Sequence, residues 1–120
     1  MIRAEINKET INNRTTYEME VKGHARNDDA AEGSESVCAA VSCMVQTLTS
    51  YLDNSIYNYE AVLEDDGYAY IRTNAEAPDT RLDEIMLFIA IALEQIAYSA
   101  PEWLQVKTFI DVTDKKNEVI

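Results

Sequence analysis

The sequence is poor in the residues that most often mark functional sites. Its 120 residues include one histidine, two cysteines, three glycines and two prolines. Two sulfurs and one distant imidazole make a poor zinc site, and so few cysteines favour a reducing compartment over a disulfide-stabilised fold. The chain also lacks internal repeats and low-complexity segments. We therefore expect one domain over residues 1–120 that needs neither a metal nor another cofactor.

Positive charge is scarce. Ten Lys and Arg residues stand against 22 Asp and Glu residues, which gives a formal net charge of −12. A nucleic-acid-binding surface needs a clustered basic face, so direct binding of nucleic acid is not expected. A basic protein or peptide is the more suitable partner.

Long hydrophobic runs are missing as well. The longest, residues 85–93, has nine residues, whereas a helix needs about 20 to cross a bilayer. The first residues alternate between apolar and polar side chains and do not resemble a secretory signal. We expect a cytoplasmic protein without a membrane partner.

Two β-hairpins are predicted from alternating patterns. The first pairs strands around residues 2–6 and 17–21, with the polar segment 7–16 and its Asn12-Asn13 pair between them. The second pairs residues 59–64 with residues 68–73 across an Asp65-Asp66-Gly67 turn. A closing strand is predicted at residues 106–112, and residues 114–120 are expected to form a flexible tail.

Helical periodicity follows each hairpin. Apolar residues recur every three or four positions over residues 34–53 and again over residues 81–99, where Asp79 or Thr80 is the expected cap. The order ββαββαβ predicts an α+β fold with a mixed sheet and two main helices. The second helix is apolar on nearly every side, which favours a homodimer in which a second subunit covers it.

The only histidine, His24, precedes Cys38 by fourteen residues. Ser34 or Ser36 can cap the first helix, and the positive end of its dipole favours the thiolate form of Cys38. His24, at the end of a strand, could accept the thiol proton. Ser42 lies one helical turn after Cys38 and could support the thiol or the imidazole by a hydrogen bond.

The segment between the two residues is acidic. Residues 26–33 lack large apolar side chains and are expected to form a mobile loop that turns sharply at Gly33. Negative charge here disfavours a thiolate but raises the proton affinity of the imidazole. We hypothesise that Asp28, Asp29 and Glu32 recognise a basic substrate.

Structural roles are the alternative for each of these residues. Cys38 could be a small buried core residue, His24 a strand-end residue and Ser42 a helix serine bonded to the backbone. Cys43 lies on the same predicted helix, roughly 8.6 Å from Cys38, which is too far for a disulfide. We interpret Cys43 as core filling or a solvent-facing bystander.

The motifs Gly23-His24-Ala25 and Val37-Cys38-Ala39-Ala40-Val41-Ser42 resemble the ribosomal-processing cysteine protease (Prp) family of bacteria. The resemblance continues through the first helix and reaches the late helix, the Ala100-Pro101-Glu102-Trp103 segment and the last strand. It implies a small homodimeric α+β endopeptidase that removes an N-terminal extension from a large-subunit ribosomal protein.

The resemblance also assigns roles. Cys38 matches the family's nucleophile and His24 its general base, while Gly23, Gly33 and Ser42 match other motif positions. Glu35 stands where the family usually has an aspartate, and the loop between His24 and Cys38 is slightly longer and more acidic than is usual. The rival functions are a non-catalytic dimeric module that binds a basic ribosomal protein or assembly factor, and a thiol-dependent acyl transferase or redox sensor.

Overall fold

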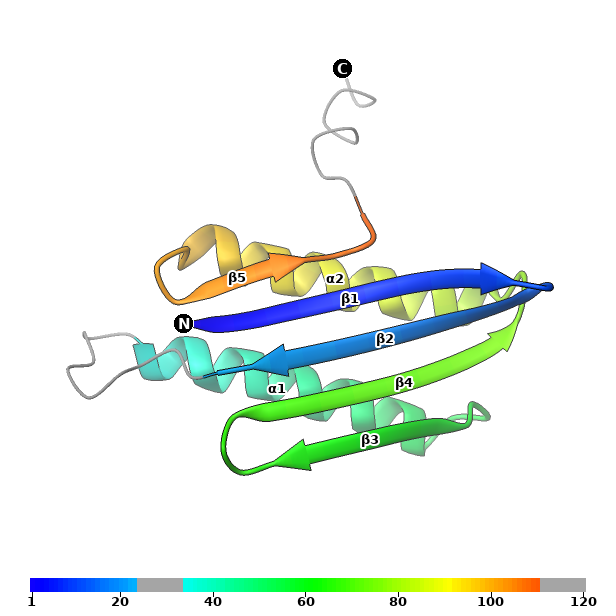
Figure 1. The fold of residues 1–120 in the computed structure, drawn as a ribbon, viewed down its shortest axis with the longest axis horizontal. Coiled ribbons are helices and arrows are strands. Elements are labelled where there is room, and N and C mark those ends of the chain that lie inside the picture. Colours follow the sequence, from blue (N-terminus) through cyan, green and yellow to red (C-terminus); the bar gives the residue numbers. More distant parts are fainter. Residues whose placement is uncertain (24–33, 111–120) are drawn as a thin grey trace, which may run out of the picture.

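A computed structural model describes residues 1–23 and 34–110 of the chain. The strands are β1 (Ile2–Ile11), β2 (Arg14–Lys22), β3 (Tyr59–Glu64), β4 (Tyr68–Glu76) and β5 (Leu104–Lys107), and the helices are α1 (Ser34–Asp53) and α2 (Thr80–Ser99). The strands form one sheet in the order β3-β4-β2-β1-β5 (Figure 1). Only β5 and β1 pair in parallel. The predicted α+β class, element order and mixed sheet are confirmed.

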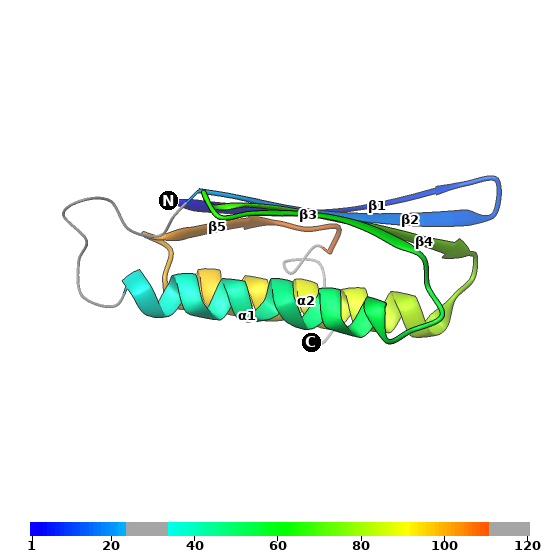
Figure 2. The same cartoon turned by 90° about the horizontal axis from the view of Figure 1, so that it is seen from below.

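Both helices pack on the same face of the sheet (Figure 2). Apolar residues recur every three or four positions along each helix and every second position along each strand, so their buried sides meet in one core. The largest fully buried side chains in this core are Tyr17, Ile6, Met19, Leu48, Leu52, Ile71, Leu82, Met86, Leu93 and Leu104. Neither helix is long and apolar enough to cross a membrane within the described ranges.

The first hairpin is longer than predicted. β1 and β2 remain paired through Ile11 and Arg14, so most of the polar segment 7–16 is strand. Asn12 and Asn13 have φ values of 51° and 62°, the left-handed conformations that suit a two-residue hairpin turn. The polar composition of this segment concealed the strands, because the outer residues of β1 are exposed on both faces.

The closing strand was predicted at residues 106–112; the strand is confirmed, but it begins earlier and ends at Lys107. β5 covers Leu104–Lys107 and pairs with only four residues of β1. The Thr108 hydroxyl then donates a hydrogen bond to the Glu94 carboxylate and accepts one from the Ile110 backbone N–H. These bonds turn the chain, and Phe109 packs edge-on against Tyr17 with 5.5 Å between ring centroids. The apolar alternation therefore reflects packing beyond the strand.

The N-terminus of α2 is capped by Asp79, one of the two predicted residues. Its carboxylate accepts hydrogen bonds from the Leu82 N–H at 2.9 Å and the Tyr57 hydroxyl at 2.7 Å. These bonds, the Leu82 bond first, hold the pKa of Asp79 below its usual value. Burial and the bond to Asp79 raise the pKa of Tyr57 to about 12.

We expect Asp79→Ala to lower the free energy of unfolding by about 2 kcal/mol in urea titrations at neutral pH, because a cap and a buried hydroxyl both lose a partner. Asp53→Ala removes only the acceptor for the exposed Tyr59 hydroxyl and should cost much less. Folding lowers the pKa of Asp79, so the ionised carboxylate stabilises the folded protein. This contribution is complete at a pH above the pKa of Asp79 in the unfolded chain, and it is lost as the pH falls through the lower pKa of the folded state. The difference in the free energy of unfolding between wild type and Asp79→Ala should therefore become smaller in acid. Equal losses for the two variants, or a constant gap, would contradict the cap assignment.

Candidate active site

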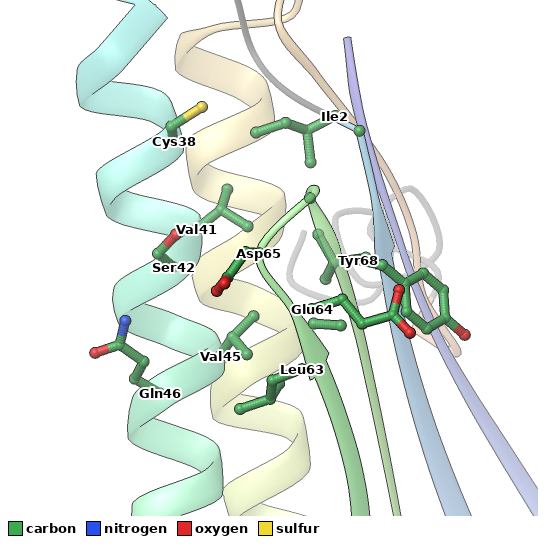
Figure 3. Close-up of a pocket in the computed structure, with 14 residues that line it drawn as sticks. Ile2, Cys38, Val41, Ser42, Val45, Gln46, Leu63, Glu64, Asp65 and Tyr68 are labelled. Carbon is green, nitrogen blue, oxygen red and sulfur yellow. The ribbon is translucent and has the colours of Figure 1, made fainter.

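One face of α1 forms the first wall of a cavity that contains Cys38. The residues on this face are spaced three or four positions apart: Cys38, Val41, Ser42, Val45 and Gln46. Cys38 is the fifth residue of α1 and is half-buried. Its sulfur points from the helix toward the side where Ile2 lies (Figure 3). The thiol therefore faces the cavity from the first turns of a helix.

The tip of the β3–β4 hairpin forms the opposite wall. Its cavity-lining residues run from the end of β3 to the start of β4: Leu63, Glu64, Asp65, Gly67, Tyr68 and Ala69. Leu63 and Asp65 extend toward α1, whereas Glu64 and Tyr68 point away from it (Figure 3). The predicted Asp-Asp-Gly turn thus lies across from the thiol, and one of its carboxylates faces the gap.

Strand ends complete the cavity. Ile2 and Val21 provide apolar surface, and Gly23 lies at the end of β2. The cavity has a volume of about 340 Å³. A small apolar hollow with a few polar groups at its edge is typical of a site for a peptide side chain or another small organic group.

The geometry of Gly23 explains the glycine that precedes His24. Its φ of +94° is in the left-handed region, and a Cβ atom there would collide with the carbonyl oxygen of Met1. Its N–H donates a 2.9 Å hydrogen bond to the carbonyl of Gly67. The residue before the only histidine is therefore fixed against the same hairpin tip that lines the cavity.

A tyrosine at the cavity edge is held as a hydrogen-bond donor. The Tyr68 hydroxyl donates to the Glu20 carboxylate at 2.9 Å on the face of the sheet opposite the helices. This bond, followed by burial, raises the pKa of Tyr68 above its ordinary value. The bond commits the Tyr68 hydroxyl to Glu20, and the side chain points away from α1 (Figure 3).

The structure brings together three of the predicted site residues, namely Gly23, Cys38 and Ser42. Glu35 lies in the first turn of α1 and is exposed. The other predicted site residues, His24, Asp28, Asp29, Glu32 and Gly33, lie outside the described residues, as do the predicted acidic loop and C-terminal tail. Their roles remain predictions.

Sequence reasoning missed the contribution of the hairpin tip to this cavity. The Asp65-Asp66-Gly67 turn was predicted, but its position opposite Cys38 depends on the pairing of β4 with β2, strands that are far apart in the chain. The alternation at residues 68–73 predicted a strand but not which strand would pair with it. The place of Ile2 in the cavity was not predictable for the same reason, since it depends on how the strands are ordered in the sheet.

The second cysteine is separate from this cavity. Cys43 is exposed, and its sulfur lies 4.0 Å from the Thr47 hydroxyl on another part of α1. Neither cysteine forms a disulfide, as predicted. Across residues 1–23 and 34–110, no three His, Cys, Asp or Glu side chains are grouped so that they could hold a metal ion.

We expect Gly23→Ala to lower kcat/KM at least about tenfold, because relieving the clash with Met1 must move the backbone that leads into His24. Peptide-cleavage kinetics and thermal unfolding should be measured together. Asn13→Ala is the matched control, since it also places alanine at a positive φ, but in the turn between β1 and β2. Full activity in Gly23→Ala would show that this glycine does not position the site.

Comparison with known proteins agrees with this geometry. Residues 1–105 match the sequence model of a protein family described as cysteine protease Prp. A crystal structure of the essential ribosomal processing protease Prp from S. aureus with a covalently linked product peptide is 20% identical, with a TM-score of 0.68 over 90% of this chain and 99% of that one.

Two further structures are similar. The S. aureus protease with a substrate peptide is 23% identical, with a TM-score of 0.66 over 90% of this chain and 99% of that one. SMU.848 from Streptococcus mutans is 21% identical, with a TM-score of 0.63 over 90% of this chain and 93% of that one. No curated protein matches the sequence. At these identities the structures support the fold, and the family match supports the chemistry.

Proposed function

This chain belongs to the Prp family of cysteine proteases, and we propose from this premise that Cys38 is its nucleophile and His24 its general base. The position of Cys38 is the observation that carries the proposal. Its thiol lies near the start of a helix and faces a cavity whose wall includes Gly23, the residue before the only histidine. A thiol near a helix N-terminus is favoured as thiolate, and a neighbouring imidazole can accept its proton.

In the proposed reaction, His24 accepts the proton of the Cys38 thiol, and the sulfur attacks the carbonyl carbon of the scissile peptide bond. His24 then donates the proton to the leaving amine, which leaves a thioester on Cys38. Water, activated by His24, hydrolyses the thioester and releases the second product. Backbone N–H groups at the start of α1 and around Gly33 are candidate donors to the oxyanion. Ser42, on the same face of α1 as the thiol, is a candidate supporting residue, and Glu35 is another.

We further propose that the substrate is the N-terminal extension of a large-subunit ribosomal protein, cleaved in the cytoplasm. Two similar S. aureus structures are of a ribosomal processing protease with a substrate or product peptide. The net charge of −12 suits a basic partner. In this proposal Asp28, Asp29 and Glu32 attract the basic part of that protein.

The test is to incubate the purified protein with the N-terminal peptide of its host's ribosomal protein and to identify the fragments by mass spectrometry. The proposal predicts one internal cut that depends on Cys38. Tight binding of the intact peptide without a cut would instead support the non-catalytic binding module.

A homodimer is also proposed, because α2 exposes one apolar stripe. Phe88, Ile91 and Tyr98 are 69%, 42% and 83% exposed and lie on one side of the helix. A groove of about 740 Å³, lined in part by Ile91, Tyr98 and Ile110, adjoins the stripe. A second copy of the same helix can cover such a stripe around a two-fold axis.

We expect Phe88→Asp to shift the protein from dimer to the 13.6 kDa monomer in sedimentation experiments, because a charge would be buried in the interface. Ile56→Asp is the control, since Ile56 is 81% exposed and lies outside α2. A monomeric wild-type protein, or a dimeric Phe88→Asp variant, would contradict the proposed interface.

A further inference from the structure

The strand β3 forms the edge of the sheet that adjoins the Cys38 cavity. Within the described part of the chain, β3 pairs with β4 alone. Leu63 and Glu64, at the end of β3, line the cavity together with Cys38. The opposite edge, β5, borders a groove with α2 that does not contain Cys38. An extended chain lying along β3 would therefore run toward the thiol, whereas one along β5 would not.

This edge lacks two of the features that often protect edge strands, lysine and proline. Every residue of β3 after Tyr59 is exposed, including Val62 at 46% and Leu63 at 52%. The strand contains no lysine and no proline, the residues that most often prevent a further strand from pairing. Unpaired backbone groups beside exposed apolar side chains are the features that domains use to bind extended peptides by strand addition.

The charges along the edge indicate the kind of peptide that fits. Glu60 and Glu64 alternate with Ala61 and Leu63, so they lie on the face away from the helices, while Asp65 extends toward α1 (Figure 3). Basic side chains on either face of an added strand would thus meet a carboxylate. Leu63 offers an apolar contact on the helix side.

We propose that the substrate binds as an added strand on the outer edge of β3, an inference that rests on the proposed proteolytic function. A basic, extended segment next to the scissile bond pairs with the β3 backbone, and the chain then continues past Leu63 and Asp65 into the cavity at Cys38. Hydrogen bonds between the backbones of the substrate and β3 hold the segment, and Glu60 and Glu64 select for positive charge.

The test uses the wild-type enzyme and the ribosomal-protein peptide of the cleavage assay, in which single amides outside the scissile bond are replaced by esters. An ester removes one N–H donor with little change of shape. Since N–H groups of a strand point alternately to its two sides, we expect kcat/KM to fall about tenfold at every second position over four to six residues. Equal effects at neighbouring positions, or no effect anywhere, would overturn strand addition.

The charge contribution is tested with Glu60→Gln/Glu64→Gln, a surface double variant. We expect KM to rise about five- to tenfold for the basic peptide and by clearly less for a peptide in which the basic residues are replaced by glutamine. Equal changes for both peptides would refute selection by these carboxylates. Failure of the cleavage proposal is distinguishable, because in that case the unmodified peptide would not be cut at all.

Discussion

Replacing Cys38 with alanine is expected to lower kcat for cleavage of the precursor peptide by at least about 10⁴-fold, since the attacking atom is removed. Peptide affinity should change little, because alanine leaves the apolar walls of the cavity in place. Single-turnover kinetics and a separate binding measurement distinguish these two effects.

Cys43→Ala is the matched control for this prediction. Cys43 is on the same helix but is exposed and lies outside the Cys38 cavity. The Cys43→Ala variant should therefore retain full activity. Residual turnover in Cys38→Ala within tenfold of wild type would exclude Cys38 as the nucleophile and would support a packing role.

Alkylation provides an independent comparison of the two thiols. Exposure alone predicts that iodoacetamide labels the exposed Cys43 faster than the half-buried Cys38. An activated thiolate at Cys38 predicts the reverse order at neutral pH. Faster labelling of Cys43 would indicate that Cys38 is not activated.

Replacing His24 with alanine is expected to lower kcat by about 10²- to 10⁴-fold, because the thiol would lose its base and the leaving amine its acid. The Cys38 nucleophile would remain, so the loss should be no larger than that of Cys38→Ala. KM should stay within about threefold of the wild-type value, since the imidazole acts on the reacting bond.

His24→Gln serves as the companion variant. Glutamine can form hydrogen bonds but cannot shuttle a proton, so it should be as slow as the alanine variant. The alkylation rate of Cys38 should fall in both variants, while that of Cys43 should not change. Activity above one tenth of wild type in either variant would contradict a catalytic role for His24.

Local patterns predicted most of the fold. The helical spacing at residues 34–53 and 81–99 and the turn at Asp65-Asp66-Gly67 are confirmed, because each depends on neighbours in the chain. The closing strand is confirmed, but its bounds differ from the predicted ones for a tertiary reason: Thr108 bonds to Glu94, and the strand ends at Lys107 although the apolar alternation continues. The β1–β2 hairpin was predicted, but not its full length, because the outer residues of β1 face solvent on both sides of the sheet.

The candidate site was only partly predictable. The motif residues Gly23, Cys38 and Ser42 line one cavity. The other half of that cavity, from Leu63 to Tyr68, carries no local signal of function. Its place opposite Cys38 follows from the sheet order, in which β4 lies between β3 and β2. Sequence patterns therefore predict single helices and strands more readily than they predict which elements lie side by side.

The hydrogen bond between Gly23 and Gly67 connects these two halves. It joins Gly23, which precedes His24 in the chain, to the tip of the β3–β4 hairpin, which forms the cavity wall that faces α1. A peptide held against the hairpin would therefore lie beside the segment that leads to the proposed base. Positioning of this kind makes a large contribution to catalysis when two groups must meet a substrate in one geometry.

A crystal structure of the wild-type protein with its product peptide bound would show whether Cys38 and His24 act as a pair. The measured quantity is the distance from the Cys38 sulfur to the nearer ring nitrogen of His24. If they act as a pair, we expect a separation of about 3 to 4 Å, with the peptide carboxyl group beside the sulfur. An ordered His24 on the far face of the sheet, with the peptide bound away from Cys38, would contradict it.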